Sequence, residues 1–129
     1  MDIVSALFVE NIDLRPVPGP STRIDLTGIM FSMPAPSAPP VTVTPHLIVL
    51  VRCRGDEDGQ GILEVVFRDE GGDQVARNVS PFQVDPGKFT YRLVRGELEY
   101  KELGTIEAHC RLLPEGPVTV VPLTLLPPV

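Results

Sequence analysis

Hydrophobic and polar residues alternate along several short stretches of the chain. Leu63, Val65 and Phe67 fall on one side of such a stretch, and Glu64 falls on the other. Similar alternation occurs at residues 88–95 and at residues 105–112. Successive side chains of a β-strand point to opposite faces, so this period predicts strands with one buried and one solvated face. In 88–95 it predicts that Phe89, Tyr91 and Leu93 form the buried face.

Turn-forming clusters of proline, glycine and aspartate divide the chain into eight predicted strands. These strands are Ile3–Ile12, Arg23–Met33, His46–Arg54, Ile62–Arg68, Gln74–Val79, Lys88–Arg95, Thr105–Leu112 and Val118–Leu126. Pro122 lies inside the last of them and predicts an edge or a bulge there, because proline cannot donate to a sheet ladder. Pro34–Pro45 is expected to be an extended, polyproline-like connection.

Composition supports an all-β protein. The 15 prolines and 11 glycines leave few windows long enough for a helix, and the gaps are rich in valine, leucine, isoleucine and threonine. A chain of 129 residues with 43% hydrophobic residues suits one core. We therefore expect a single domain over residues 1–129, an antiparallel β-sandwich of about eight strands.

Several segments extend this expectation by resemblance. They are Ala6-Leu-Phe-Val-Glu-Asn-Ile12, Ile24-Asp-Leu-Thr-Gly28, Leu47–Arg52, Phe67-Arg-Asp-Glu-Gly71 and Leu103-Gly-Thr-Ile106. Their order resembles a family of short, uncharacterised bacterial proteins with an immunoglobulin-like β-sandwich. The resemblance implies that fold and no catalytic residues. The chain departs from a true immunoglobulin domain because it has no tryptophan and because Cys110 comes late after Gly104.

Charge narrows the expected partners. The formal net charge is −6, with 17 acidic and 11 basic residues, and the basic residues are scattered. Such a surface repels phosphate backbones and anionic lipids, so we expect no nucleic acid and no membrane as a partner. Asp2 stands where a secretion signal would carry basic residues, and the expected location is the cytoplasm.

Candidate chemistry is sparse. His46 and His109 are far apart and have no clustered ligands, so we expect surface histidines, no cofactor and no enzyme. Asp56 and Asp58 begin a segment like a calcium loop, but Phe67 stands where the last glutamate is needed. A calcium- or small-ligand-binding sandwich using Asp56, Asp58 and Asp85 is the alternative function.

The two cysteines fall on predicted inward faces of their strands. A disulfide between Cys53 and Cys110 would fit an immunoglobulin-like topology, but two buried, reduced thiols are the favoured interpretation. Neither has the basic surroundings of a reactive thiolate.

The most informative pattern is a loss of alternation in two strands. Leu47, Val49 and Val51 occupy one face of the third predicted strand, yet Ile48 and Leu50 make the other face apolar as well. The second predicted strand adds a similar second set at its end, Ile29, Phe31 and Met33. One core covers only one face of a sheet, so a second apolar face needs another cover.

Two covers remain open: the proline-rich segment Pro34–Pro45, or another protein chain. We expect a protein interface at Ile29, Phe31, Met33, Ile48 and Leu50. The expected function is a non-catalytic interaction or assembly module that binds a protein partner or itself, as a homo-oligomer or as a subunit of a larger bacterial or phage assembly.

Overall fold

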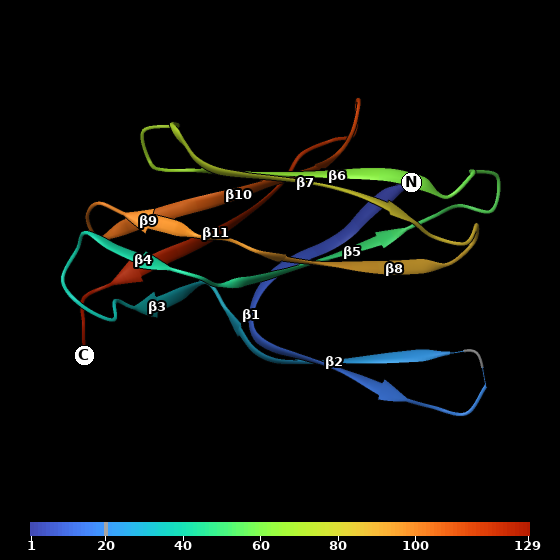
Figure 1. Cartoon of the computed structure of the whole chain (residues 1–129), viewed down its shortest axis with the longest axis horizontal. Helices are drawn as coiled ribbons and strands as arrows, with labels where there is room; N and C mark the ends of the chain where they lie inside the picture. The colour runs from blue at the N-terminus through green and yellow to red at the C-terminus, as the bar shows by residue number, and fades with distance from the viewer. Residues whose placement is uncertain (20) are drawn as a thin grey trace.

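Two packed β-sheets form the body of the protein in a computed structural model, which describes residues 1–19 and 21–129 (Figure 1). The four-stranded sheet has the order β2 (Thr22–Met30), β1 (Asp2–Pro16), β5 (His46–Arg52), β8 (Phe89–Arg95). The five-stranded sheet has the order β3 (Ser32–Pro34), β11 (Thr119–Leu126), β10 (Gly104–Leu112), β6 (Gln60–Arg68), β7 (Gln74–Gln83). A small sheet pairs β4 (Val41–Val43) with β9 (Leu98–Tyr100).

The eight predicted strands all overlap observed ones, and the all-β, sandwich-like prediction is confirmed. The described residues contain no helix, and so none with the length and apolar character to cross a membrane. Pro34–Pro45 is less irregular than expected, because it contains β4 and buries Ala35 and Val43 in the core.

The core lies between the sheets and follows the alternation. Leu63 and Val65 of β6 are 0% exposed, as are Leu47 and Val49 of β5, and all four belong to one buried cluster. Full burial of such a side chain contributes about 1.5–3 kcal/mol. Tyr100 of β9 is buried too, and its hydroxyl donates a hydrogen bond of 2.6 Å to the Leu123 carbonyl oxygen of β11.

The predicted strand Arg23–Met33 is in fact two strands in different sheets. Strand β2 ends at Met30, the chain bends at Phe31, and β3 then pairs in parallel with β11. The Thr124 amide donates to the Phe31 carbonyl oxygen at 2.8 Å, which holds the crossing in place. Strand β3 pairs only with residues 124–126 of β11, so Pro122 lies where β11 has one neighbouring strand, as a proline requires.

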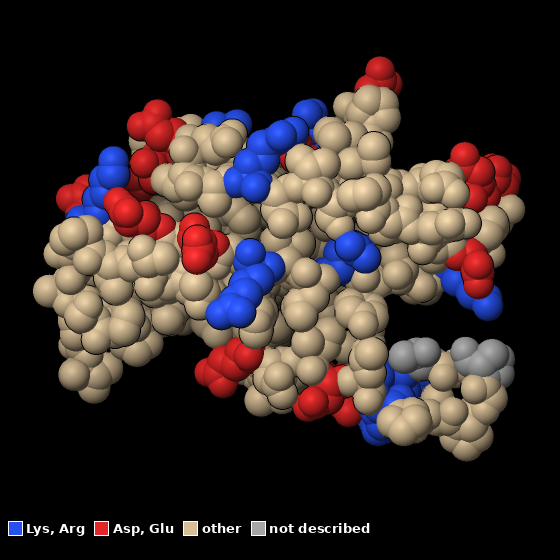
Figure 2. Space-filling view, viewed as in Figure 1, with Lys and Arg blue, Asp and Glu red and all other residues tan. Residues whose placement is uncertain are grey.

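Strand β1 extends well beyond the point where its pairing with β5 ends. It pairs with β5 from Asp2 to Val9 and with β2 from Phe8 to Pro16. Residues 11–16 of β1 and 22–27 of β2 therefore form a two-stranded projection, which we call the arm. Figures 1 and 2 show the arm standing apart from the body, with an open notch between them. At its base Gly28 has φ of 67°, a left-handed conformation that favours glycine.

Candidate interaction surface

The outer face of the four-stranded sheet is apolar across several strands. Leu7 of β1 lies opposite Ile48 of β5, and Ile48 lies opposite Leu93 of β8. Directly opposite residues of an antiparallel pair share a face, so these three side chains form one row across the sheet. The inner face is set by their neighbours, such as Leu47 and Val49, which lie in the core.

Two further apolar pairs lie in the rows on either side of this one, which also contain Ser5, His46 and Arg95. Leu50 lies opposite Tyr91, and Val9 lies opposite Ile29 of the edge strand β2. We call the whole set the apolar face; its members are Leu7, Val9, Ile29, Ile48, Leu50, Tyr91 and Leu93.

The apolar face is partly open to solvent. Ile29 is 52% exposed and Leu93 is 43% exposed, while Ile48 between them is only 1% exposed. Ile48 and Val9 are therefore buried although they lie outside the core between the sheets. The surrounding apolar face shields them, and its rim remains exposed.

The structure brings together three of the five residues predicted for the interface. Ile29, Ile48 and Leu50 share the apolar face. Phe31 is 58% exposed at the bend that follows β2. Met33 lies opposite Leu125 in the other sheet and packs against the core, because the chain has crossed between sheets by that point.

Strand β8 is oriented opposite to the prediction. Phe89 is 65% exposed, and Leu93 and Tyr91 lie on the outer face, whereas Val94 is buried in the core. Arg92 takes an inward position and donates hydrogen bonds to the Ser80 hydroxyl of β7, at 3.2 Å from Nε and 2.5 Å from Nη2. A partly buried arginine can occupy such a place when its polar end finds an acceptor. The prediction that Phe89, Tyr91 and Leu93 face the core was wrong.

Tyr91 and Leu93 were accordingly missed as members of the apolar face, as were Leu7 and Val9. The segment Ala6-Leu-Phe-Val carries apolar residues at both parities, which is the same signal that identified Ile48 and Leu50. The same reasoning could therefore have identified Leu7 and Val9 from the sequence of β1.

The outer face of the five-stranded sheet carries an ion-paired cluster at its centre, with exposed Val79 and Val120 beside it. Glu64 of β6 is 8% exposed and lies between two arginines on the neighbouring strands. Its Oε2 accepts a hydrogen bond of 2.8 Å from Arg77 Nη2, and its Oε1 accepts one of 2.9 Å from Arg111 Nε. These bonds, first that of Arg77 and then that of Arg111, lower the pKa of Glu64. On the same face, His109 lies 3.3 Å from Glu107.

The proline-rich segment lies at the end of the sandwich. Strand β4 pairs with β9, and Ala35 and Val43 enter the core. Residues 42–45 and Pro36 line a cavity of about 420 Å³ whose other wall includes Val9 and His46. The segment thus borders the apolar face near Val9, while Ile29 and Leu93 keep their exposure.

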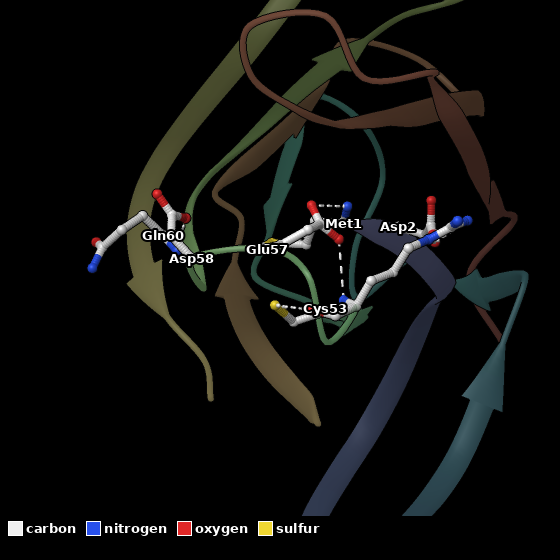
Figure 3. Close-up of polar contacts among 7 residues, drawn as sticks. Met1, Asp2, Cys53, Glu57, Asp58 and Gln60 are labelled. Carbon is white, nitrogen blue, oxygen red and sulfur yellow. Dashed lines mark hydrogen bonds and ion pairs between the residues drawn. The ribbon is translucent and has the colours of Figure 1, made fainter. Parts of the chain in front are cut away.

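The acidic loop before β6 is organised by local hydrogen bonds. Asp58 Oδ1 accepts a hydrogen bond of 2.9 Å from the Gln60 amide. Asp85 lies in a different loop, between β7 and β8, where its Oδ2 is 3.6 Å from Lys88 Nζ. Figure 3 shows the Glu57 carboxylate turned toward the Met1 amino group, away from Asp58. Within residues 1–19 and 21–129, no three acidic, histidine or cysteine side chains gather in a group that could hold a metal ion.

The two thiols are buried and not joined. Cys53 is 1% exposed and Cys110 is 0% exposed, which confirms the predicted burial. Burial raises the pKa of the Cys110 thiol to about 12. A thiol held in its neutral form is a poor nucleophile.

No family model, no curated protein and no solved structure matches this chain. The feature that bears on function is the difference between the centres of the two outer faces, ion-paired in the five-stranded sheet and apolar in the four-stranded sheet.

Proposed function

We propose that the protein is a non-catalytic interaction module that associates with copies of itself through the apolar face. The observation that carries this proposal is the exposure of Ile29 and Leu93 on a face that also contains Ile48 and Val9. Contiguous exposed apolar patches on soluble proteins mark interaction sites, and burying them in a second copy removes apolar area from water.

The difference between the two sheets supports this choice. The five-stranded sheet carries the charged cluster of Glu64, Arg77 and Arg111 at the centre of its outer face, side chains suited to contact with water. The four-stranded sheet carries apolar residues in the equivalent place. Self-association is favoured over an unrelated partner because an apolar patch is complementary to its own copy about a two-fold axis.

An immunoglobulin-like topology is part of the same proposal. With β2 set aside, the four-stranded sheet reads β1-β5-β8 and its partner reads β11-β10-β6-β7, with β3 at the edge. These orders match the strands A-B-E and G-F-C-C′ of an immunoglobulin-like sandwich, with β2 as an added edge strand. Cys53 then follows strand B and Cys110 lies in strand F, the strands that carry the disulfide of antibody domains.

The test is a charge introduced at the exposed rim of the apolar face. The variant Ile29→Glu with Leu93→Glu changes two exposed side chains and leaves buried Ile48 intact. We expect a folded protein whose mass by light scattering is smaller than that of the wild type. The control is Val79→Glu with Val120→Glu, which places charges at 43% and 46% exposed positions on the other outer face. The control should associate as the wild type does.

Two results would overturn the proposal. One is a wild-type protein that remains monomeric at every concentration examined. The other is an unchanged mass in the Ile29→Glu, Leu93→Glu variant with its circular dichroism spectrum intact.

A further inference from the structure

The arm is a strand pair without a covering layer. Its β1 residues 11–16 pair with β2, and the pairing of β1 with β5 has ended at Val9. A two-stranded hairpin alone is only marginally stable in water, and a third strand or a packing partner is normally needed. The outer edge of β2 is also the edge of the whole sheet.

One side of the arm is apolar. Ile12 lies opposite Leu26, and Leu14 lies opposite Ile24, so these four side chains share a face. Leu14 is 53% exposed, the other three are half-buried, and none of the four belongs to the core cluster. The arm is thus a two-stranded sheet with an uncovered apolar face and a free strand edge.

The polar side of the arm has an unfavourable arrangement within one chain. Asp13 lies directly opposite Asp25, and Arg15 lies directly opposite Arg23. Like charges in directly opposite positions destabilise a strand pair. Arg15 and Asp25 relieve this in part by a diagonal ion pair of 2.8 Å, and among the described residues Arg23 has no ion pair.

The order of charges along β2 suits a second copy of the same strand. Arg23, Ile24 and Asp25 read base, apolar, acid. If two β2 strands pair antiparallel about a two-fold axis at Ile24, Arg23 of each copy lies opposite Asp25 of the other. Ile24 then lies opposite its own copy on the apolar side. The like-charge rows of one chain thus gain two opposite-charge pairs between chains.

We propose that β2 of the arm pairs edge to edge with β2 of a second copy, centred on Ile24, to form a four-stranded sheet. This inference rests on the proposed self-association and adds a contact separate from the apolar face. Strand β1 carries a similar charge order at Asp13 and Arg15, but residues 42–46 line a cavity with Glu10 on that side of the arm. The β2 edge is the free edge of the sheet, and pairing centred on Ile24 joins residues 22–26 of the two copies.

The test uses the symmetry of the pairing. Arg23→Asp makes both charges of the β2 edge acidic, and Asp25→Arg makes both basic. When two molecules of the same variant pair, only like charges lie opposite each other. We therefore expect the self-association of each variant to weaken about tenfold or more. A mixture of the two variants restores both opposite-charge pairs, and the mixed complex should form with nearly the affinity of the wild type.

Sedimentation equilibrium on each variant and on the mixture measures these affinities, and circular dichroism checks the fold. The control Glu115→Arg makes the same change of charge in the exposed loop between β10 and β11, and it should associate as the wild type does. Restored association in the mixture cannot come from misfolding, because both partners must be folded to pair.

The outcomes separate this inference from the proposed function. If the wild type associates, Ile29→Glu with Leu93→Glu weakens it and the β2 variants change nothing, the edge pairing is wrong and the apolar face stands. Weak association in both the single variants and their mixture also rejects the pairing. A wild type that is monomeric rejects both.

Discussion

The ring of Phe82 lies directly over Gly61 on the neighbouring strand. A Cβ at position 61 would lie 2.4 Å from Cζ of that ring, and Phe82 is itself 8% exposed and part of the core. Glycine at this place lets an aromatic ring lie against the backbone of the next strand.

Gly61→Ala should therefore push the Phe82 ring out of its position. Overpacking of this kind costs about 1–3 kcal/mol of unfolding free energy, measured by urea denaturation. Gly55→Ala is the control, because a Cβ there meets nothing within 4 Å. In a Phe82→Leu background the cost of Gly61→Ala should shrink, and an equal cost in both backgrounds would contradict the assigned contact.

The arm should depend on the left-handed conformation of Gly28. Gly28→Ala places a side chain at φ of 67°, which costs about 1–2 kcal/mol. The added Cβ also meets Glu10, whose flexible side chain can move away. We expect faster amide hydrogen exchange in residues 11–16 and 22–27 and little change in β6 and β10. A uniform loss of protection across the molecule would argue against local control of the arm.

Glu64 should make stability depend on acid. Its folded pKa lies below the ordinary value of 4.5, so its contribution is present above that pH and is lost as the pH falls through the lower, folded value. Glu64→Gln should cost about 1 kcal/mol at neutral pH. The difference from the wild type should narrow in acid and in high salt, as read from thermal melting. Glu115→Gln, in an exposed loop, should behave as the wild type.

The buried thiols should resist labelling in the native protein. We expect Cys53 and Cys110 to react with a thiol reagent only after denaturation, because they are 1% and 0% exposed. The raised pKa of Cys110 also makes folding stability depend on pH, but here stability is lost as the pH rises, whereas for Glu64 it is lost as the pH falls. Its contribution to stability is complete below the ordinary thiol value of 9.0 and is lost as the pH rises toward about 12. Rapid labelling of the native protein would contradict the burial.

The strands that could be predicted from sequence are those in which apolar and polar residues alternate over many positions. Leu63, Val65 and Phe67 alternate within β6, and both the strand and its buried face were predicted correctly. Strands β3, β4 and β9 were missed because each has three residues, too few for a period, and pairs with a distant segment. Strand β7 continues past the predicted end through Pro81, which is tolerated because β7 lies at a sheet edge.

The candidate surface was predictable only in part for a similar reason. Apolar residues at both parities identified Ile48 and Leu50, since no single core can bury both faces of β5. The inward turn of Arg92 could not be foreseen, because its acceptor Ser80 lies on another sheet. Met33 was predicted to share a face with Ile29 because the apolar alternation continues unbroken through Phe31, where the chain in fact bends from one sheet to the other.

The salt-bridged outer face also sets a limit on growth. Both carboxylate oxygens of Glu64 accept hydrogen bonds from arginines, so the centre of this face is charged, whereas the centre of the opposite face is Ile48 with its apolar neighbours. Two copies that met through their apolar faces, as we propose, would turn the ion-paired faces outward and leave no second apolar face for a third copy to meet in the same way. Association through the apolar face alone would therefore stop at a pair, and only a second contact, such as the proposed β2 pairing, would extend the complex beyond it.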